Sequence, residues 1–121
     1  MNELLREKKC VPCEGGVTPL NAREIHEYLD QIPDWVVRET KQDDKSVQTL
    51  QKRFQFKNFR EGMAFLRKVE DIAEAEGHHP DFCVHYNKID FTIWTHAIGG
   101  LHENDFILAA RINAIIEDER Q

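Results

Sequence analysis

The sequence lacks a long hydrophobic segment. No part of its 121 residues approaches the roughly 20 consecutive apolar residues that a transmembrane helix requires. The first nine residues alternate charges around two leucines and do not resemble a secretory signal peptide. Cysteine is scarce as well: the chain has three, an odd number, which is typical of reduced thiols in the cytosol when a secretory signal is absent. We therefore expect a cytoplasmic protein without a membrane segment.

An excess of basic residues is also absent. The chain carries 16 Lys and Arg against 22 Asp and Glu, a net charge of −6 with His neutral. Residues 1–60 contain 11 basic and 10 acidic side chains, whereas residues 61–121 contain 5 and 12, so the negative charge is concentrated in the second half. An acidic surface without a basic stripe repels phosphate backbones. These counts argue against a nucleic-acid-binding protein and against a polybasic protein of the membrane surface.

The length fits one domain. At this size folding buries roughly two thirds of the surface that the unfolded chain exposes, which is enough for one hydrophobic core without disulfides or metals. We divide the chain into a polar N-terminal arm, residues 1–19, and a single domain, residues 20–121. The arm has no periodicity that would bury a face, so we expect it on the surface or on a partner subunit.

The arm contains two cysteines, Cys10 and Cys13, at the spacing of half a zinc site. A structural zinc site needs four ligands, and no second pair follows. Thioredoxin-like cysteine pairs lie at a strand-to-helix junction, which the arm does not provide. We expect neither a metal site nor a redox role, and interpret the pair as part of a solvated or subunit-contacting arm.

Hydrophobic periodicity predicts three helices and four strands. Asn21 with Glu24 predicts a capping box at the start of the first helix, as Asn58 does with Glu61 for the second, and Gly77 is typical of a left-handed helix end. The strands are joined in pairs by short turns, which cannot link parallel strands. We therefore expect an α+β domain with an antiparallel sheet and helices packed on one face. The predicted elements are a helix over 21–31, strands over 35–39 and 46–56, a helix over 58–76, strands over 82–86 and 89–96, and a helix over 103–118.

Five of the six histidines fall between residues 78 and 102. His78 and His79 follow the long predicted helix, and His96 ends the last predicted strand beside Trp94, which shares its polar face. Histidine exchanges protons near neutral pH, which general acid and base catalysis requires. Adjacent histidines in a loop are more often solvated surface residues. A site is favoured by His96, which lies on the polar face of a predicted strand whose opposite face belongs to the core. Asp105, in the first turn of the last helix, complements the positive end of that helix, a structural role at least as well supported as a catalytic one.

Five short motifs occur in order along the chain: Gly77-His78-His79-Pro80-Asp81, Tyr86-Asn87-Lys88, Thr95-His96, Gly100-Leu101 and Asn104-Asp105. Together they resemble the pterin-4a-carbinolamine dehydratase family. The resemblance covers about residues 21–116. It implies an α+β fold with a four-stranded antiparallel sheet and three helices on one face. It also implies a hydro-lyase that dehydrates 4a-hydroxytetrahydrobiopterin to the quinonoid dihydropterin, and thereby recycles the pterin of an aromatic amino acid hydroxylase.

The resemblance also assigns roles to residues. It implies catalytic roles for His78, His79 and His96, no metal or redox cofactor, and a homodimer or homotetramer. Gly77 and Ala97 stand where relatives carry acids, so we expect no carboxylate beside the histidines from these two positions. A non-catalytic module that binds or assembles other proteins is the alternative function. The residues that we expect to bind the substrate are Gly77, Trp94, Thr95 and Asp105.

Overall fold

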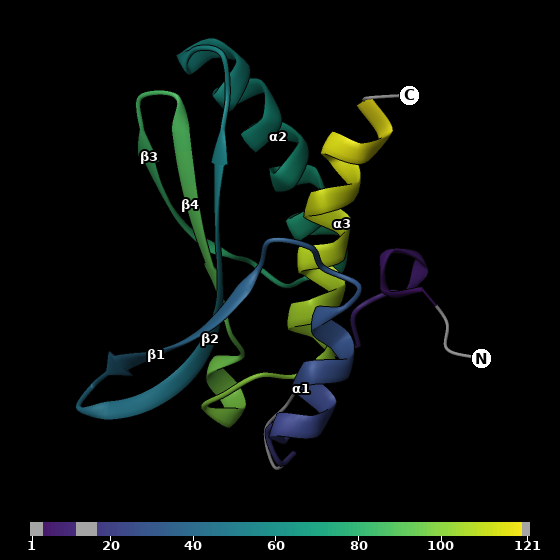
Figure 1. Cartoon of the computed structure of the whole chain (residues 1–121), viewed down its shortest axis with the longest axis vertical. Helices are drawn as coiled ribbons and strands as arrows, with labels where there is room; N and C mark the ends of the chain where they lie inside the picture. The colour runs from purple at the N-terminus through teal and green to yellow at the C-terminus, as the bar shows by residue number, and fades with distance from the viewer. Residues whose placement is uncertain (1–3, 12–16, 120–121) are drawn as a thin grey trace.

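A four-stranded antiparallel sheet with three α-helices on one face forms the molecule, as predicted (Figure 1). The computed structural model describes residues 4–11 and 17–119; Cys13 and the predictions made for it lie outside this part of the chain. The helices are α1 (Ala22–Leu29), α2 (Phe59–Glu76) and α3 (Glu103–Glu119), with short 3₁₀ helices η1 (Leu5–Glu7) and η2 (His96–Ile98). The strands are β1 (Val36–Gln42), β2 (Lys45–Gln55), β3 (Asp81–His85) and β4 (Lys88–Ile93).

The strand order is β1-β2-β4-β3, and every neighbouring pair is antiparallel. Helix α2 carries the chain from β2 to the outer strand β3, and β4 then returns between them. This path brings the C-terminal end of α2 and the C-terminal end of β4 toward the start of α3. The candidate site lies where these three ends meet.

Local signals define the helix ends. Asn21 and Glu24 exchange the two hydrogen bonds of the predicted capping box, at 3.0 and 2.9 Å. Of the box predicted at α2, the structure shows the bond from the Glu61 amide to the Asn58 side chain, at 2.9 Å. Gly77 ends α2 in the left-handed region with φ of 65°, as predicted. A side chain rarely adopts this conformation, which explains a glycine here.

The core lies between the sheet and the helices. Its centre is a cluster of aromatic rings, and the buried face of β4 alternates as the sequence predicts. Phe82 and Tyr86, in the outer strand region, remain 49% and 67% exposed because β3 lies at the edge of the sheet. The clustered rings are Trp35, Phe54, Phe65 and Phe91, and the alternating residues of β4 are Ile89, Phe91 and Ile93.

The expectation that the N-terminal arm buries no face is wrong for its described part. Leu5 is 1% exposed and belongs to the core, and η1 packs on α3. Helix α3 is buried on nearly all sides from Asn104 to Ala114. Its broad apolar surface is covered in part by the arm of the same chain.

The last strand is shorter than predicted. It ends at Ile93, and His96 begins η2 instead of continuing the strand. The cause is a tight loop closed by Thr95, whose amide donates to the Gly100 carbonyl at 2.9 Å and whose carbonyl accepts from Gly99 at 3.1 Å. Gly99 holds a φ of 65°, which permits the turn.

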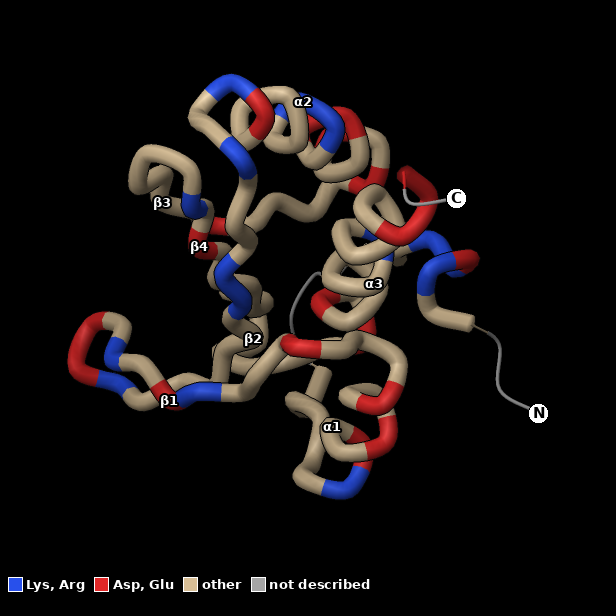
Figure 2. Tube along the Cα trace, turned by 45° about the horizontal axis from the view of Figure 1, so that its top comes forward, with Lys and Arg blue, Asp and Glu red and all other residues tan. Residues whose placement is uncertain are grey.

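The charges are distributed unevenly over the elements (Figure 2). Strand β2 carries Lys and Arg but no Asp or Glu, whereas α3 carries five acidic residues and one Arg. In residues 4–11 and 17–119, no helix is both long and apolar enough to cross a membrane.

Candidate functional site

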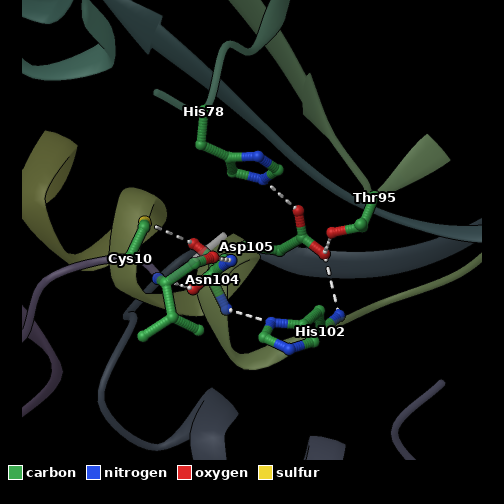
Figure 3. Close-up of polar contacts among 7 residues, drawn as sticks. Cys10, His78, Thr95, His102, Asn104 and Asp105 are labelled. Atoms are coloured by element: carbon green, nitrogen blue, oxygen red, sulfur yellow. Dashed lines mark hydrogen bonds and ion pairs between the residues drawn. The ribbon is translucent and has the colours of Figure 1, made fainter. Parts of the chain in front are cut away.

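The centre of the candidate site is a hydrogen bond between His78 and Asp105. The left-handed turn at Gly77 ends α2, and the His78 amide donates to the Ala73 carbonyl at 3.2 Å. This turn directs the His78 side chain toward the first turn of α3. Its Nε2 lies 2.6 Å from Oδ1 of Asp105 (Figure 3). The His78 side chain is 17% exposed and that of Asp105 is fully buried.

Asp105 has three hydrogen-bond donors. Besides His78, the Thr95 hydroxyl donates to Oδ2 at 2.8 Å and the His102 amide donates to the same atom at 2.9 Å. The His102 ring in turn accepts the Asn104 amide at its Nδ1, at 3.0 Å. His102 and Asp105 therefore cap α3 reciprocally, which supports the structural role expected for Asp105. The same carboxylate also fixes the ring of His78, because an ionised carboxylate only accepts hydrogen bonds.

His79 has a different partner. Its Nε2 lies 2.6 Å from Oε2 of Glu74, and both side chains are largely exposed. Carboxylates thus reach two of the three predicted histidines, although Gly77 and Ala97 supply none. Glu74 lies on the last turn of α2, and Asp105 comes from another helix.

His96 stacks on Trp94. The ring centroids lie 3.7 Å apart with an interplanar angle of 22°. Trp94 is buried and His96 is exposed. The pair forms a flat wall, as expected from their proximity, although His96 reaches it from η2 and not from a strand.

These residues surround a pocket of about 490 Å³. This volume lies in the range typical of small-molecule sites. Of the seven predicted site residues, all but Asp105 line the pocket; Asp105 lies behind His78 and holds it. The predicted residues that line it are Gly77, His78, His79, Trp94, Thr95 and His96, and the others are Cys10, Val11, Glu76, Ala97 and Asn104.

Four of these lining residues, Cys10, Val11, Glu76 and Asn104, were not predicted as site residues. Glu76 directly precedes Gly77, and Asn104 directly precedes Asp105. Their positions next to predicted site residues could have indicated that they lie at the pocket. Nothing in the sequence of the arm indicated that Cys10 and Val11 reach the pocket. Burial, together with the neighbouring Glu76 carboxylate, raises the pKa of the Cys10 thiol to about 12, so the thiol stays protonated at neutral pH.

The remaining histidines lie apart from the pocket or serve the fold. His26 is exposed on α1. His85 is exposed on β3, with Nε2 3.5 Å from Asp90. Within residues 4–11 and 17–119, no group of three or more His, Cys, Asp or Glu side chains is arranged to hold a metal ion.

Comparison with known proteins identifies the family. The family model described as "Pterin 4 alpha carbinolamine dehydratase" matches residues 18–115. The chain belongs to this family. A relative from Halorhodospira halophila, provisionally named a pterin-4-alpha-carbinolamine dehydratase, is 42% identical over 111 residues, which are 92% of this chain and 96% of that protein. A relative from Chlorobium luteolum with the same provisional name is 42% identical over 114 residues, covering 94% of this chain and 96% of the relative.

Two solved structures are similar in fold. One, from Brucella melitensis, is described as a transcriptional coactivator/pterin dehydratase; its TM-score is 0.68 at 31% identity, over 81% of this chain and 98% of that chain. The other is a pterin dehydratase-like protein described as a RuBisCO assembly factor in the alpha-carboxysome, with a TM-score of 0.54 at 26% identity, over 70% of this chain and 92% of that chain. A protein of similar fold is thus described by an assembly role.

Proposed function

We propose that this protein is a hydro-lyase that converts 4a-hydroxytetrahydrobiopterin into the quinonoid dihydropterin and water. The observation that carries the proposal is the hydrogen bond between His78 and the buried Asp105, beside a pocket that His78 lines together with His79 and His96. Membership of a family described as a dehydratase agrees with it.

The reaction needs one proton donor and one proton acceptor. The C4a–O bond breaks, and the hydroxyl leaves as water after it takes up a proton. The ring nitrogen bonded to C4a loses its proton, and the electron pair left on that nitrogen forms the new double bond to C4a. Histidines supply both functions at neutral pH, and such catalysis typically contributes about 100-fold to 10,000-fold.

His78 is the proposed proton acceptor. As a carboxylate, Asp105 only accepts hydrogen bonds, so the nitrogen of His78 that faces it, Nε2, carries the proton of the neutral ring. The other ring nitrogen, Nδ1, keeps its lone pair. The carboxylate also stabilises the positive charge that the ring gains when it takes the proton. Asp105 is thus a positioning residue in this scheme.

His79 is the proposed proton donor to the leaving hydroxyl. It lies at the exposed side of the pocket, where Glu74 orients its ring. His96 and Trp94 offer a flat stacked surface for a bicyclic ring. Gly77 and Thr95 complete the lining near His78.

Further expectations follow from this function. The reaction as written requires neither a metal nor a redox cofactor. We propose that the protein acts in the cytoplasm, recycling pterin for an aromatic amino acid hydroxylase. We also propose a homodimer or homotetramer, which the exposed Phe82 and Tyr86 beside edge strand β3 support, because a second copy would cover them.

A direct assay tests the proposed function. Chemically generated 4a-hydroxytetrahydrobiopterin loses water spontaneously, so the rate with protein is compared with the rate without it. Turnover above the spontaneous rate supports the enzyme. A His85→Ala variant, which alters an exposed histidine outside the pocket, should retain that turnover.

A non-catalytic assembly role is the second candidate. The observation that favours it is the similarity to a protein described as a RuBisCO assembly factor. Absence of turnover at high protein concentration, with the fold intact by circular dichroism, would favour this role over catalysis.

A further inference from the structure

The described N-terminal segment, residues 4–11, runs along the body of its own chain; we call it the N-terminal strap. At its start, the Leu5 amide donates to Gln31 at 2.8 Å, and Arg6 pairs with Asp118 at 2.9 Å. Further along, Lys8 pairs with Glu103 at 2.6 Å. These contacts join the strap to α3 and to the segment after α1, so its course is fixed before it reaches the pocket.

The end of the strap is held by two side chains of the pocket. The Cys10 amide donates to Oε1 of Glu76 at 2.7 Å. Asn104 forms two bonds with Val11: its Oδ1 accepts the Val11 amide at 2.9 Å, and its Nδ2 donates to the Val11 carbonyl at 2.6 Å (Figure 3). Asn104 is 3% exposed and adjoins Asp105. The strap is therefore fastened to the same helical turn that holds His78.

We propose that Cys10 and Val11 form a substrate-binding wall of the pocket, and that Glu76 and Asn104 are the positioning residues that hold it. The proposal rests on the proposed function and extends it to the arm. Both amides and the Val11 carbonyl are already bonded to protein groups. The side chains of Cys10 and Val11 remain to contact a ligand, and they present uncharged, mainly apolar surface.

This chemistry defines the role of the wall. Val11 is 56% exposed and lines the pocket, so a planar ligand that covers its side chain removes apolar surface from water. Neither residue has a group that transfers a proton at neutral pH. The wall should therefore contribute to substrate binding and leave the chemical step unchanged.

The test compares two exposed valines. Val11→Ala removes two methyl groups from the wall, and Val17→Ala makes the same change at a residue that is 49% exposed and does not line the pocket. We expect Val11→Ala to raise KM about fivefold with kcat unchanged, on the basis of the apolar area that a ligand would cover. Val17→Ala should match the wild type. Equal KM values in the two variants would overturn the proposal.

A second pair of variants tests the positioning role. Glu76→Gln keeps an oxygen that accepts the Cys10 amide, whereas Glu76→Ala removes it. We expect Glu76→Ala to raise KM and Glu76→Gln to restore it. If the two variants have the same KM, Glu76 does not act through the strap.

Direct binding separates this proposal from the proposed reaction. Isothermal titration calorimetry with 7,8-dihydrobiopterin, a stable reduced pterin, gives a dissociation constant without turnover. Binding that Val11→Ala weakens, in a protein with no turnover, supports the wall and refutes the reaction. Turnover with unchanged KM and unchanged binding in Val11→Ala refutes the wall and supports the reaction. Absence of both turnover and binding in the wild type refutes both.

Discussion

Replacing Asp105 by Asn tests the proposed proton acceptor most directly. The carboxylate accepts one hydrogen bond at Oδ1, from His78, and two at Oδ2, from Thr95 and the His102 amide. An asparagine has a single oxygen, which should turn to the side that has two donors. Its amide NH₂ then faces Nε2 of His78. Since NH₂ only donates, His78 must move its proton to Nδ1, and the nitrogen proposed to act as base loses its lone pair.

The Asp105→Asn replacement should have two separate effects, one on the free energy of unfolding and one on kcat. The variant keeps the shape of the side chain and two hydrogen bonds, and it reverses the third, but it removes the charge that strengthens all three. The loss in free energy of unfolding should therefore be about 1–3 kcal/mol. Loss of a general base should reduce kcat by about 100-fold or more, which corresponds to about 2.7 kcal/mol in activation free energy. The activity should therefore fall far beyond what partial unfolding explains.

The assay is stopped-flow measurement of dehydration at pH 7, with thermal unfolding measured on the same samples. Nitrogen-15 chemical shifts of the His78 ring report which nitrogen carries the proton, a change that a merely structural role would not cause. Asp90→Asn is the matched control, because Asp90 pairs with Arg53 on the sheet surface outside the pocket. A folded Asp105→Asn protein with wild-type kcat would refute the assignment of His78 and Asp105.

Three further predictions concern single groups. His79→Ala should remove most turnover and leave the circular dichroism spectrum unchanged; wild-type rates would refute its role as proton donor. Cys10, whose pKa is raised to about 12 by burial, should react with iodoacetamide at pH 8 at least about 100-fold more slowly than exposed Cys83, as peptide mass spectrometry would show; equal labelling would contradict its environment. The third prediction concerns Asp90, whose hydrogen bond to Arg53 lowers its pKa below the ordinary 3.8. The pair therefore stabilises the fold at pH values above 3.8, and this stabilisation is lost as the pH falls through the lowered pKa. The stability difference between wild type and Arg53→Gln in urea should accordingly vanish in strong acid, and a difference independent of pH would argue against the pair.

Local sequence signals predicted the fold because they act over a few residues. The capping box at Asn21 and the left-handed end at Gly77 each depend on neighbours within one helical turn. The short strand connections exclude parallel pairing by geometry alone. The end of β4 was missed because it depends on a loop in which the Thr95 amide bonds to Gly100, and strand periodicity carries no information about such a bond.

The site was predicted less completely because its contacts are tertiary. The three histidines and Asp105 were selected, yet the bond between His78 and Asp105 joins residues 27 apart in sequence. Asp105 was interpreted mainly through its own helix, where its capping role indeed holds. The contact of Asn104 with Val11 spans 93 residues, and no pattern in the arm reveals it.

The first turn of α3 has a consequence for how the molecule assembles. This one turn, from Glu103 to Asp105, holds the strap, caps its own helix and fixes the ring of His78. Contacts between segments so distant in sequence form late, since the chain must first close long loops. The pocket is thus completed only when the last helix of the fold docks between the first residues and the end of α2. If the proposed pterin binding is measured during refolding, its recovery should report completion of the whole fold, whereas recovery of the helical circular dichroism signal should report only the formation of its helices.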